Sequence, residues 1–270
     1  MRALALHPDV LVVSSALLRL NCVIVRGAVD GAGAADGEVF VIDSPLLPDE
    51  LDALPALLEQ ARFPQPSGLL ATHADWDHLL GRLAFPAAAL GCGEAAAERL
   101  RGDPGGAQRQ LREFDEQLMI ERPRPLSLGS VQALPVPGRL DVGDRELELA
   151  PAPGHTADGI AVLIAWAGVL VAGDYLSPLE LPSLGEGGDA GEYLETLERL
   201  RALMGRADHV VPGHGPVLDC ARALDLLEED LTYLHALLGA GAGARLPGGR
   251  RGAAQRRLHA ENVAAIARGG

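Results

Sequence analysis

The chain has 270 residues, of which 48% are hydrophobic and only 3% are aromatic, and its formal net charge is −14. This length and composition predict a single globular domain over residues 1–270 with a largely aliphatic core. The acidic balance argues against a nucleic-acid partner, because phosphate contacts need clustered Lys and Arg. The dense basic run at residues 250–257 is short, and we interpret it as a solvated segment that opens a last helix.

Cysteine usage and hydropathy indicate a cytoplasmic protein with no membrane partner. Cys22, Cys92 and Cys220 are far apart and odd in number, so they form neither a disulfide framework nor a zinc-binding CxxC pattern. The apolar run at residues 10–18 lacks the basic start of a signal peptide and is too short to span a membrane. A homodimer is compatible with this evidence.

In chain order, apolar runs predict strands at residues 10–13, 17–25 and 39–42, with a glycine-rich turn at 27–37. Pro48 opens a helix with leucines on one face, and a buried strand at residues 68–72 ends in a polar cluster. Further elements expected on the same grounds are helices at residues 94–101, 107–119 and 190–204, and strands within 131–150 and at 160–165, 169–172 and 210–211.

The C-terminal part predicts two helices. Asp219 is a candidate N-cap, and the leucines that follow it recur at steps of three and four residues, which is typical of an amphipathic helix. The residues expected on its buried face are Leu224, Leu227, Leu231, Leu234 and Leu238. A glycine-rich link at residues 239–249 leads to a final helix at 253–267.

Two imidazoles and two carboxylates follow the strand at 68–72, in the string Thr-His-Ala-Asp-Trp-Asp-His at residues 72–78. A divalent cation would neutralise such a cluster, and histidine nitrogen and carboxylate oxygen suit Zn, Fe or Mn. In an extended loop, His73, Asp75 and Asp77 point one way while His78 turns to another, so one peptide can serve two neighbouring metals. The competing interpretation is a polar turn in which Asp77 caps the next helix.

Three distant segments add donors of the same kind. His155 follows Pro153 and Gly154 on a tight turn, Asp174 ends a predicted strand, and His214 lies between two glycines where the backbone can approach closely.

These motifs carry a resemblance to a known family. The string THADWDHLLG resembles the T-H-x-H-x-D-H-x-x-G signature of the metallo-β-lactamase superfamily, and PGHT, AGD and PGHG follow in the family's order. The resemblance covers residues 10–220, and the C-terminal helices of residues 219–270 extend this motif-bearing core. It implies an α/β (α+β) fold, a four-layer αββα sandwich of two mixed β-sheets flanked by helices, with metals at one edge between the sheets.

The resemblance also implies two divalent metal ions, with zinc expected first and iron or manganese as alternatives. Carried over residue by residue, the ligands are His73, Asp75 and His155 for the first ion, Asp77, His78 and His214 for the second, and Asp174 as a bridge. Asp75 departs from the family pattern, which usually has His there. A carboxylate at this position lowers the net charge of the site and favours harder metals. In this respect the chain resembles the iron-binding flavodiiron members.

This resemblance implies an enzyme, a metallo-hydrolase in which a metal-bound hydroxide cleaves a small ester, thioester, lactone or phosphoester. Asp77 is the expected catalytic residue, because it would orient the nucleophile and the metal. Two alternatives stay open: an iron-dependent oxygenase similar to the persulfide dioxygenases, and a non-catalytic metal-binding sensor.

Other polar residues have plainer interpretations. Asp43 either forms a turn or orients a ligand from behind, and Tyr175 either packs or touches substrate. The segment at residues 176–190 is expected to form part of the pocket wall. The remaining histidines are expected to have structural or solvent roles: His7, His209, His235 and His259.

Overall fold

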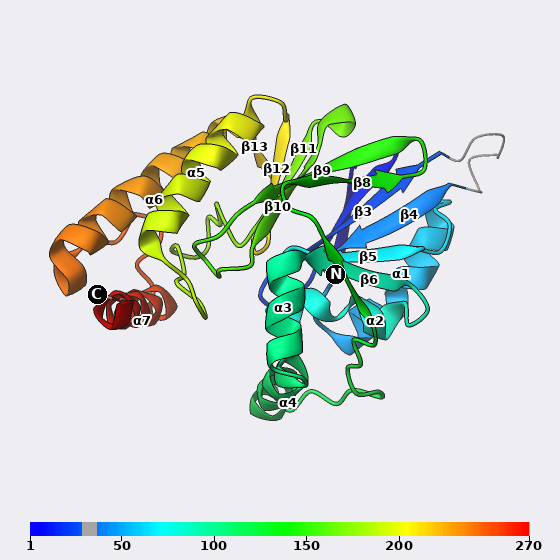
Figure 1. Ribbon diagram of the computed structural model, residues 1–270, viewed down its shortest axis with the longest axis horizontal. Coiled ribbons are helices and arrows are strands. Elements are labelled where there is room, and N and C mark those ends of the chain that lie inside the picture. Colours follow the sequence, from blue (N-terminus) through cyan, green and yellow to red (C-terminus); the bar gives the residue numbers. More distant parts are fainter. Residues whose placement is uncertain (29–36, 270) are drawn as a thin grey trace. The chain divides into compact units, whose positions relative to one another are not determined.

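The computed structural model describes residues 1–28 and 37–269, so most of the turn expected at residues 27–37 lies outside the described residues. The strands form two mixed β-sheets. The chain divides into two compact units, Met1–Leu149 and Ala150–Gly270, whose helices and strands are drawn in Figure 1. Each unit has its own apolar core. Within the described residues, no helix is long and apolar enough to cross a membrane.

The first unit is built on a seven-stranded sheet whose strands lie in chain order. They are β1 (Arg2–His7), β2 (Val10–Ser14), β3 (Asn21–Gly27), β4 (Glu38–Ile42), β5 (Gly68–Ala71), β6 (Ala89–Gly93) and β7 (Val131–Leu134). Neighbours are antiparallel from β1 to β4 and parallel from β4 to β7. Because β4 and β5 are parallel, with Ile42 beside Leu70, the polar residues that follow the two strands come together.

Helices pack apolar side chains against one face of this sheet. The helical elements of the unit are α1 (Pro48–Gln60), η2 (Trp76–Leu79), α2 (Gly81–Ala84), α3 (Glu94–Gly102) and α4 (Gly106–Leu118). Alternate strand residues such as Cys22 and Ile24 meet Leu54 and Leu58 of α1 in one core. Each of these leucines is 0% exposed, and burial of such a side chain contributes about 1.5–3 kcal/mol. A hairpin of β8 (Gly138–Val142) and β9 (Arg145–Pro151) follows.

The second unit combines short strands with long helices. Its elements are β10 (Ile160–Ile164), η3 (Ala165–Ala167), β11 (Val169–Gly173), α5 (Ala190–Met204), β12 (His209–Pro212), β13 (Leu218–Asp219), α6 (Cys220–Ala240), η4 (Gly241–Gly243) and α7 (Ala253–Gly269). Strands β11 and β12 are parallel, so both end at the same edge. Helices α5 and α6 run side by side over the core (Figure 1). Asp219 caps α6 as predicted, by accepting a hydrogen bond from the Arg222 N–H.

Several elements differ from the predictions. Strands β1 and β6 were missed, because β1 carries mostly exposed side chains and β6 is a short Ala- and Gly-rich segment. The strand expected from residue 17 begins at Asn21, after a turn with positive φ at Leu18 and Arg19.

The predicted buried face of α6 was also partly wrong. Leu224 and Leu238 are exposed, and the buried face is centred one position away, on residues that include Leu226, Tyr233 and Leu237. The sequence offered leucines at helical spacing on more than one face of this helix, so spacing alone did not select the buried one.

Candidate metal centre

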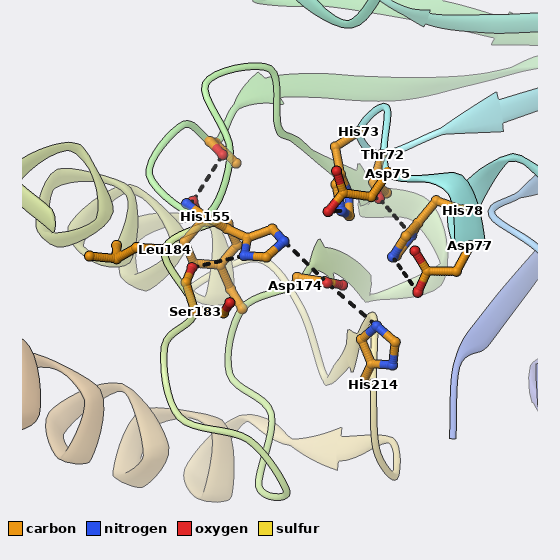
Figure 2. Close-up of polar contacts among 12 residues, drawn as sticks. Thr72, His73, Asp75, Asp77, His78, His155, Asp174, Ser183, Leu184 and His214 are labelled. Atoms are coloured by element: carbon orange, nitrogen blue, oxygen red, sulfur yellow. Dashed lines mark hydrogen bonds and ion pairs between the residues drawn. The ribbon is translucent and has the colours of Figure 1, made fainter. Parts of the chain in front are cut away.

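The first unit carries four candidate ligands on one short loop. His73 comes two residues after β5, Asp75 is the N-cap residue of η2, and Asp77 and His78 lie within η2. The His78 N–H donates to the Asp75 carbonyl at 3.1 Å, so this tight turn fixes where the side chains project. Both imidazoles are buried, and the four side chains of the loop lie close together in Figure 2.

Distances within this loop suit shared metal ligation. His73 Nε2 lies 3.5 Å from Asp75 Oδ2, and His78 Nε2 lies 4.0 Å from Asp77 Oδ2. Two donors that bind one tetrahedral metal at about 2.1 Å are about 3.4 Å apart. The His73 and Asp75 donors match that spacing, while the other pair is wider.

Asp43 orients the imidazoles of this loop. Its carboxylate accepts hydrogen bonds from Thr72 N at 2.8 Å and Thr72 Oγ1 at 2.9 Å, and its Oδ2 lies 3.0 Å from His78 Nδ1. Because a carboxylate accepts, the His78 proton belongs on Nδ1, which leaves the Nε2 lone pair for a metal. The Thr72 hydroxyl lies 3.1 Å from His73 Nδ1, and because it donates its own proton to Asp43, it can accept a hydrogen bond from that ring. The structure therefore supports the interpretation in which Asp43 orients a ligand, rather than the one in which it only forms a turn.

Asp75 has a cationic partner that the sequence did not reveal. Arg99 of α3 lies with Nη2 2.8 Å from Asp75 Oδ1, while the other carboxylate oxygen faces His73. Arg99 is 24 residues further along the chain, and no local pattern connects it with the loop. The carboxylate that departs from the family pattern is therefore accompanied by a positive charge.

The second unit brings three distant candidate ligands together. Asp174 follows β11 and His214 follows β12, and these parallel strands end at the same edge. His155 Nε2 and His214 Nε2 each lie 3.4 Å from the same oxygen, Asp174 Oδ2 (Figure 2). This oxygen lies between two ring nitrogens, at the spacing expected for ligands that share a tetrahedral metal at about 2.1 Å.

Close backbone packing makes this arrangement possible at two glycines. A Cβ at Gly213 would overlap Asp174 Oδ1, so any side chain there would push the carboxylate away. Gly154 has φ +126°, and a Cβ there would overlap the backbone of Tyr193. The glycines of the PGHT and PGHG motifs are therefore required by space and backbone conformation.

The turn that carries His155 is braced by Tyr175 and by the Ser183 carbonyl. The Tyr175 hydroxyl accepts from the His155 N–H at 2.9 Å and lies 2.8 Å from the Pro153 carbonyl, to which it can donate. Burial raises the pKa of Tyr175 far above its usual value, and its side chain packs rather than facing solvent. On the ring itself, His155 Nδ1 lies 2.8 Å from the Ser183 carbonyl.

The remaining histidines lie away from the two clusters within their own units. His209 begins β12, His235 is exposed on α6, and His259 Nδ1 contacts the Tyr233 hydroxyl at 3.0 Å. His7 is half-buried beside Asp9.

The donor set fits divalent metals in each unit. Imidazole nitrogen and carboxylate oxygen are ligands of zinc, iron and manganese, and outer hydrogen bonds to Nδ1 are the usual accompaniment of a metal-binding histidine. His78 has such a contact from Asp43 and His155 has one from Ser183. Both clusters therefore have the chemistry of metal-binding groups.

Comparison with known proteins places the chain in a family. Residues 20–214 match the metallo-beta-lactamase superfamily, and this span includes every candidate ligand. The chain belongs to the metallo-β-lactamase superfamily.

Individual relatives support this family assignment. The chain is 30% identical over 191 residues to the acyl-coenzyme A thioesterase MBLAC2 of Gallus gallus, covering 65% of this chain and 68% of that protein. A metallo-beta-lactamase family protein from Thermus thermophilus has the same fold, with a TM-score of 0.67, 23% identity and coverage of 97% and 95% of the two chains. A metallo-beta-lactamase from Pontibacter korlensis gives a TM-score of 0.59 at 18% identity, over 84% of this chain and 98% of that one. The predicted α/β class, with two mixed sheets flanked by helices, is confirmed.

Proposed function

We propose that this protein is a metal-dependent hydrolase that cleaves a small ester or thioester. The observation that carries the proposal is the donor set itself. Seven His and Asp side chains stand in the order of the superfamily's motifs, and His78 and His155 have Nδ1 contacts that leave Nε2 for a metal.

The proposed ligand sets follow the family motifs. His73, Asp75 and His155 would hold one divalent ion, Asp77, His78 and His214 a second, and Asp174 would bridge them. Zinc is the first candidate, because imidazoles make up the larger part of this set, and iron and manganese accept the same donors. When bound, such ions lower the pKa of water and polarise the oxygen that gains charge during hydrolysis.

Other residues of the protein orient the proposed metal ligands. Asp43 and the Ser183 carbonyl hold the rings of His78 and His155 with Nε2 directed away from them. Asp77 is proposed to orient the attacking water.

Arg99 is proposed to offset the charge of Asp75. Three carboxylates and one hydroxide carry −4 against +4 from two divalent ions, and the Arg99 guanidinium 2.8 Å from Asp75 adds +1. With His at position 75 and no arginine, the sum would also be +1, so the ion pair returns the site to the charge of the usual family pattern.

A thioester is the preferred substrate class. The relative in Gallus gallus is an acyl-coenzyme A thioesterase, and a small acyl substrate needs only the metals and a pocket formed by loops such as residues 176–190. RNA is disfavoured by the net charge of −14, and the basic run at 250–257 has no aromatic residues for base stacking.

An acyl-CoA thioester, an aryl ester, a lactone, a phosphodiester and single-stranded RNA should be assayed side by side with zinc, iron or manganese. We expect metal-dependent cleavage of the thioester or ester. Asp77→Ala and His78→Ala should lose more than the roughly 10- to 100-fold that follows loss of an outer-shell partner. Asp225→Ala, which removes an exposed carboxylate on α6, should retain wild-type rates.

Three results would contradict the proposal. Faster metal-dependent cleavage of RNA than of any small ester would change the substrate class. Tightly bound iron with O2 consumption and no hydrolysis would instead identify an oxygenase. Stable metal loading without turnover of any substrate would indicate a sensor.

A further inference from the structure

A buried amide on the last helix contacts the loop between β11 and α5. Asn262 of α7 is 0% exposed. Its Nδ2 donates to the Pro182 carbonyl at 2.7 Å, and its Oδ1 accepts from the Leu184 N–H at 3.0 Å. The two hydrogen bonds flank Ser183 and fix the peptide groups on both sides of it.

The carbonyl of Ser183 is the group that contacts His155. His155 Nδ1 lies 2.8 Å from this oxygen. Figure 2 marks the contact between the two residues. A carbonyl can only accept a hydrogen bond, so the proton belongs on Nδ1 and the lone pair on Nε2. That Nε2 atom lies 3.4 Å from Asp174 Oδ2.

We propose that Asn262 is a positioning residue for His155. By holding Pro182 and Leu184, it aims the Ser183 carbonyl at Nδ1 and so fixes both the ring orientation and the tautomer in which Nε2 can bind a metal. The metal-binding part of this inference rests on the proposed function, in which His155 is a ligand.

The chemistry of the contact requires a carboxamide. The loop presents one acceptor and one donor, and an asparagine side chain supplies the complementary donor and acceptor. The Tyr233 hydroxyl lies 3.1 Å from Asn262 Nδ2 and accepts a second hydrogen bond from it, which fixes which way the amide points.

Neighbouring contacts hold other parts of the same loop. Gln255 Oε1 accepts from the Leu181 N–H at 2.8 Å, and Arg250 donates to the Glu180 carbonyl at 2.7 Å. Neither contact flanks Ser183. Gln255 therefore offers a matched control, because it also lies on α7 and also contributes one side-chain amide to the loop.

The test compares the full-length wild type with Asn262→Leu, Asn262→Asp and Gln255→Leu. Two-bond 1H–15N NMR correlations of the His155 ring report its tautomer in the metal-free protein. Competition with a chelator then measures the affinity for zinc. Asn262→Leu removes both hydrogen bonds to the loop, and the one to Tyr233, at nearly constant shape, whereas Asn262→Asp keeps the acceptor for Leu184.

In the wild type and in Gln255→Leu, we expect His155 protonated at Nδ1. In Asn262→Leu, we expect a mixture of tautomers and zinc affinity lowered by about 10- to 100-fold, the usual cost of losing an outer-shell partner. The zinc affinity of Asn262→Asp should lie between those of the wild type and Asn262→Leu. If the leucine variant does not fold, the aspartate variant tests the proposal.

An unchanged His155 tautomer in the Asn262 variants would overturn the proposal and leave Asn262 a purely structural role. Equal losses of zinc affinity in Gln255→Leu would do the same. Absence of hydrolysis by the wild type would refute the proposed function alone, because the tautomer is read in the metal-free protein.

Discussion

The two clusters of candidate ligands are held in opposite ways. In the first unit, four donors lie within six residues of one loop, and charged side chains from elsewhere, Asp43 and Arg99, contact them. In the second unit, three donors come from three separate turns. The Ser183 carbonyl contacts the ring of His155, and close packing at Gly154 and Gly213 constrains the backbone beside the donors. The first cluster should therefore respond most to changes of charge, and the second to changes of shape.

Among variants that leave every proposed ligand in the sequence, the largest effect is expected from Gly213→Ala in the second unit. The added Cβ would overlap Asp174 Oδ1, so the carboxylate must leave its place between the two ring nitrogens. A displacement of about 1 Å at such a site costs roughly 100-fold in rate, and we expect a loss of that order in both zinc affinity and hydrolysis. Metal content and kcat/KM measure it.

Gly239→Ala is the matched control, because a Cβ at that position on α6 meets nothing within 4 Å. Wild-type activity in Gly213→Ala would show that the Asp174 carboxylate tolerates displacement. The expectation that the second cluster responds most to changes of shape would then be wrong.

Asp43→Asn tests the first cluster through charge at nearly constant shape. Asp43 has φ +56°, and asparagine tolerates this left-handed conformation as well as aspartate does. The variant keeps an acceptor for Thr72 but weakens the charged contact with His78 Nδ1. We expect zinc affinity to fall by about tenfold, at the low end of outer-shell effects.

Asp49→Asn, an acid at the start of α1, controls for the change of net charge. If Asp43→Asn bound zinc as tightly as this control does, the charge of Asp43 would have no part in orienting His78.

Asp75→His and Arg99→Gln should shift metal preference in opposite directions. The first variant raises the net charge of the proposed site and should favour zinc, and the second lowers it and should favour iron or manganese. Competitive loading with the three metals measures the shift, for which a change of a few-fold is expected. Unchanged selectivity in both variants would indicate that geometry, rather than the Asp75–Arg99 pair, determines the metal.

The smallest effect on zinc affinity is expected from Asp230→Asn, which instead changes the pH dependence of stability. Asp230 is buried on α6 with Arg250, and desolvation raises its pKa to about 7 although Arg250 opposes the rise. The unfolded chain releases this proton near pH 3.8 and the folded protein near 7, so the contribution of Asp230 to stability decreases as pH rises through that window.

Urea unfolding at several pH values should therefore show that wild-type stability, relative to Asp230→Asn, declines between about pH 4 and 7 and levels off above. Asp225→Asn, on the same helix but exposed, should follow the wild type. A constant difference between wild type and Asp230→Asn across the window would mean that Asp230 is ionised throughout.

The same contrast explains what the sequence could predict. The four donors of the first unit are nearly contiguous, so the cluster was visible in the string itself, and the glycines beside His155 and His214 marked the close turns. Arg99, Ser183 and Asn262 were not predicted, because their contacts join segments far apart in the chain and the Ser183 contact uses a carbonyl that every residue has. Strand β6 was missed because small residues give no clear period.

The contact between α7 and the loop around Ser183 also affects the order in which the protein forms during translation. Leu184 and Asn262 are 78 residues apart, so at 5–20 residues per second the ribosome adds the second partner about 4–16 s after the first. Asp43, Thr72, His78 and Arg99 have by then all been made. A metal ion present during synthesis therefore meets a complete first cluster before the carbonyl beside His155 has its final support.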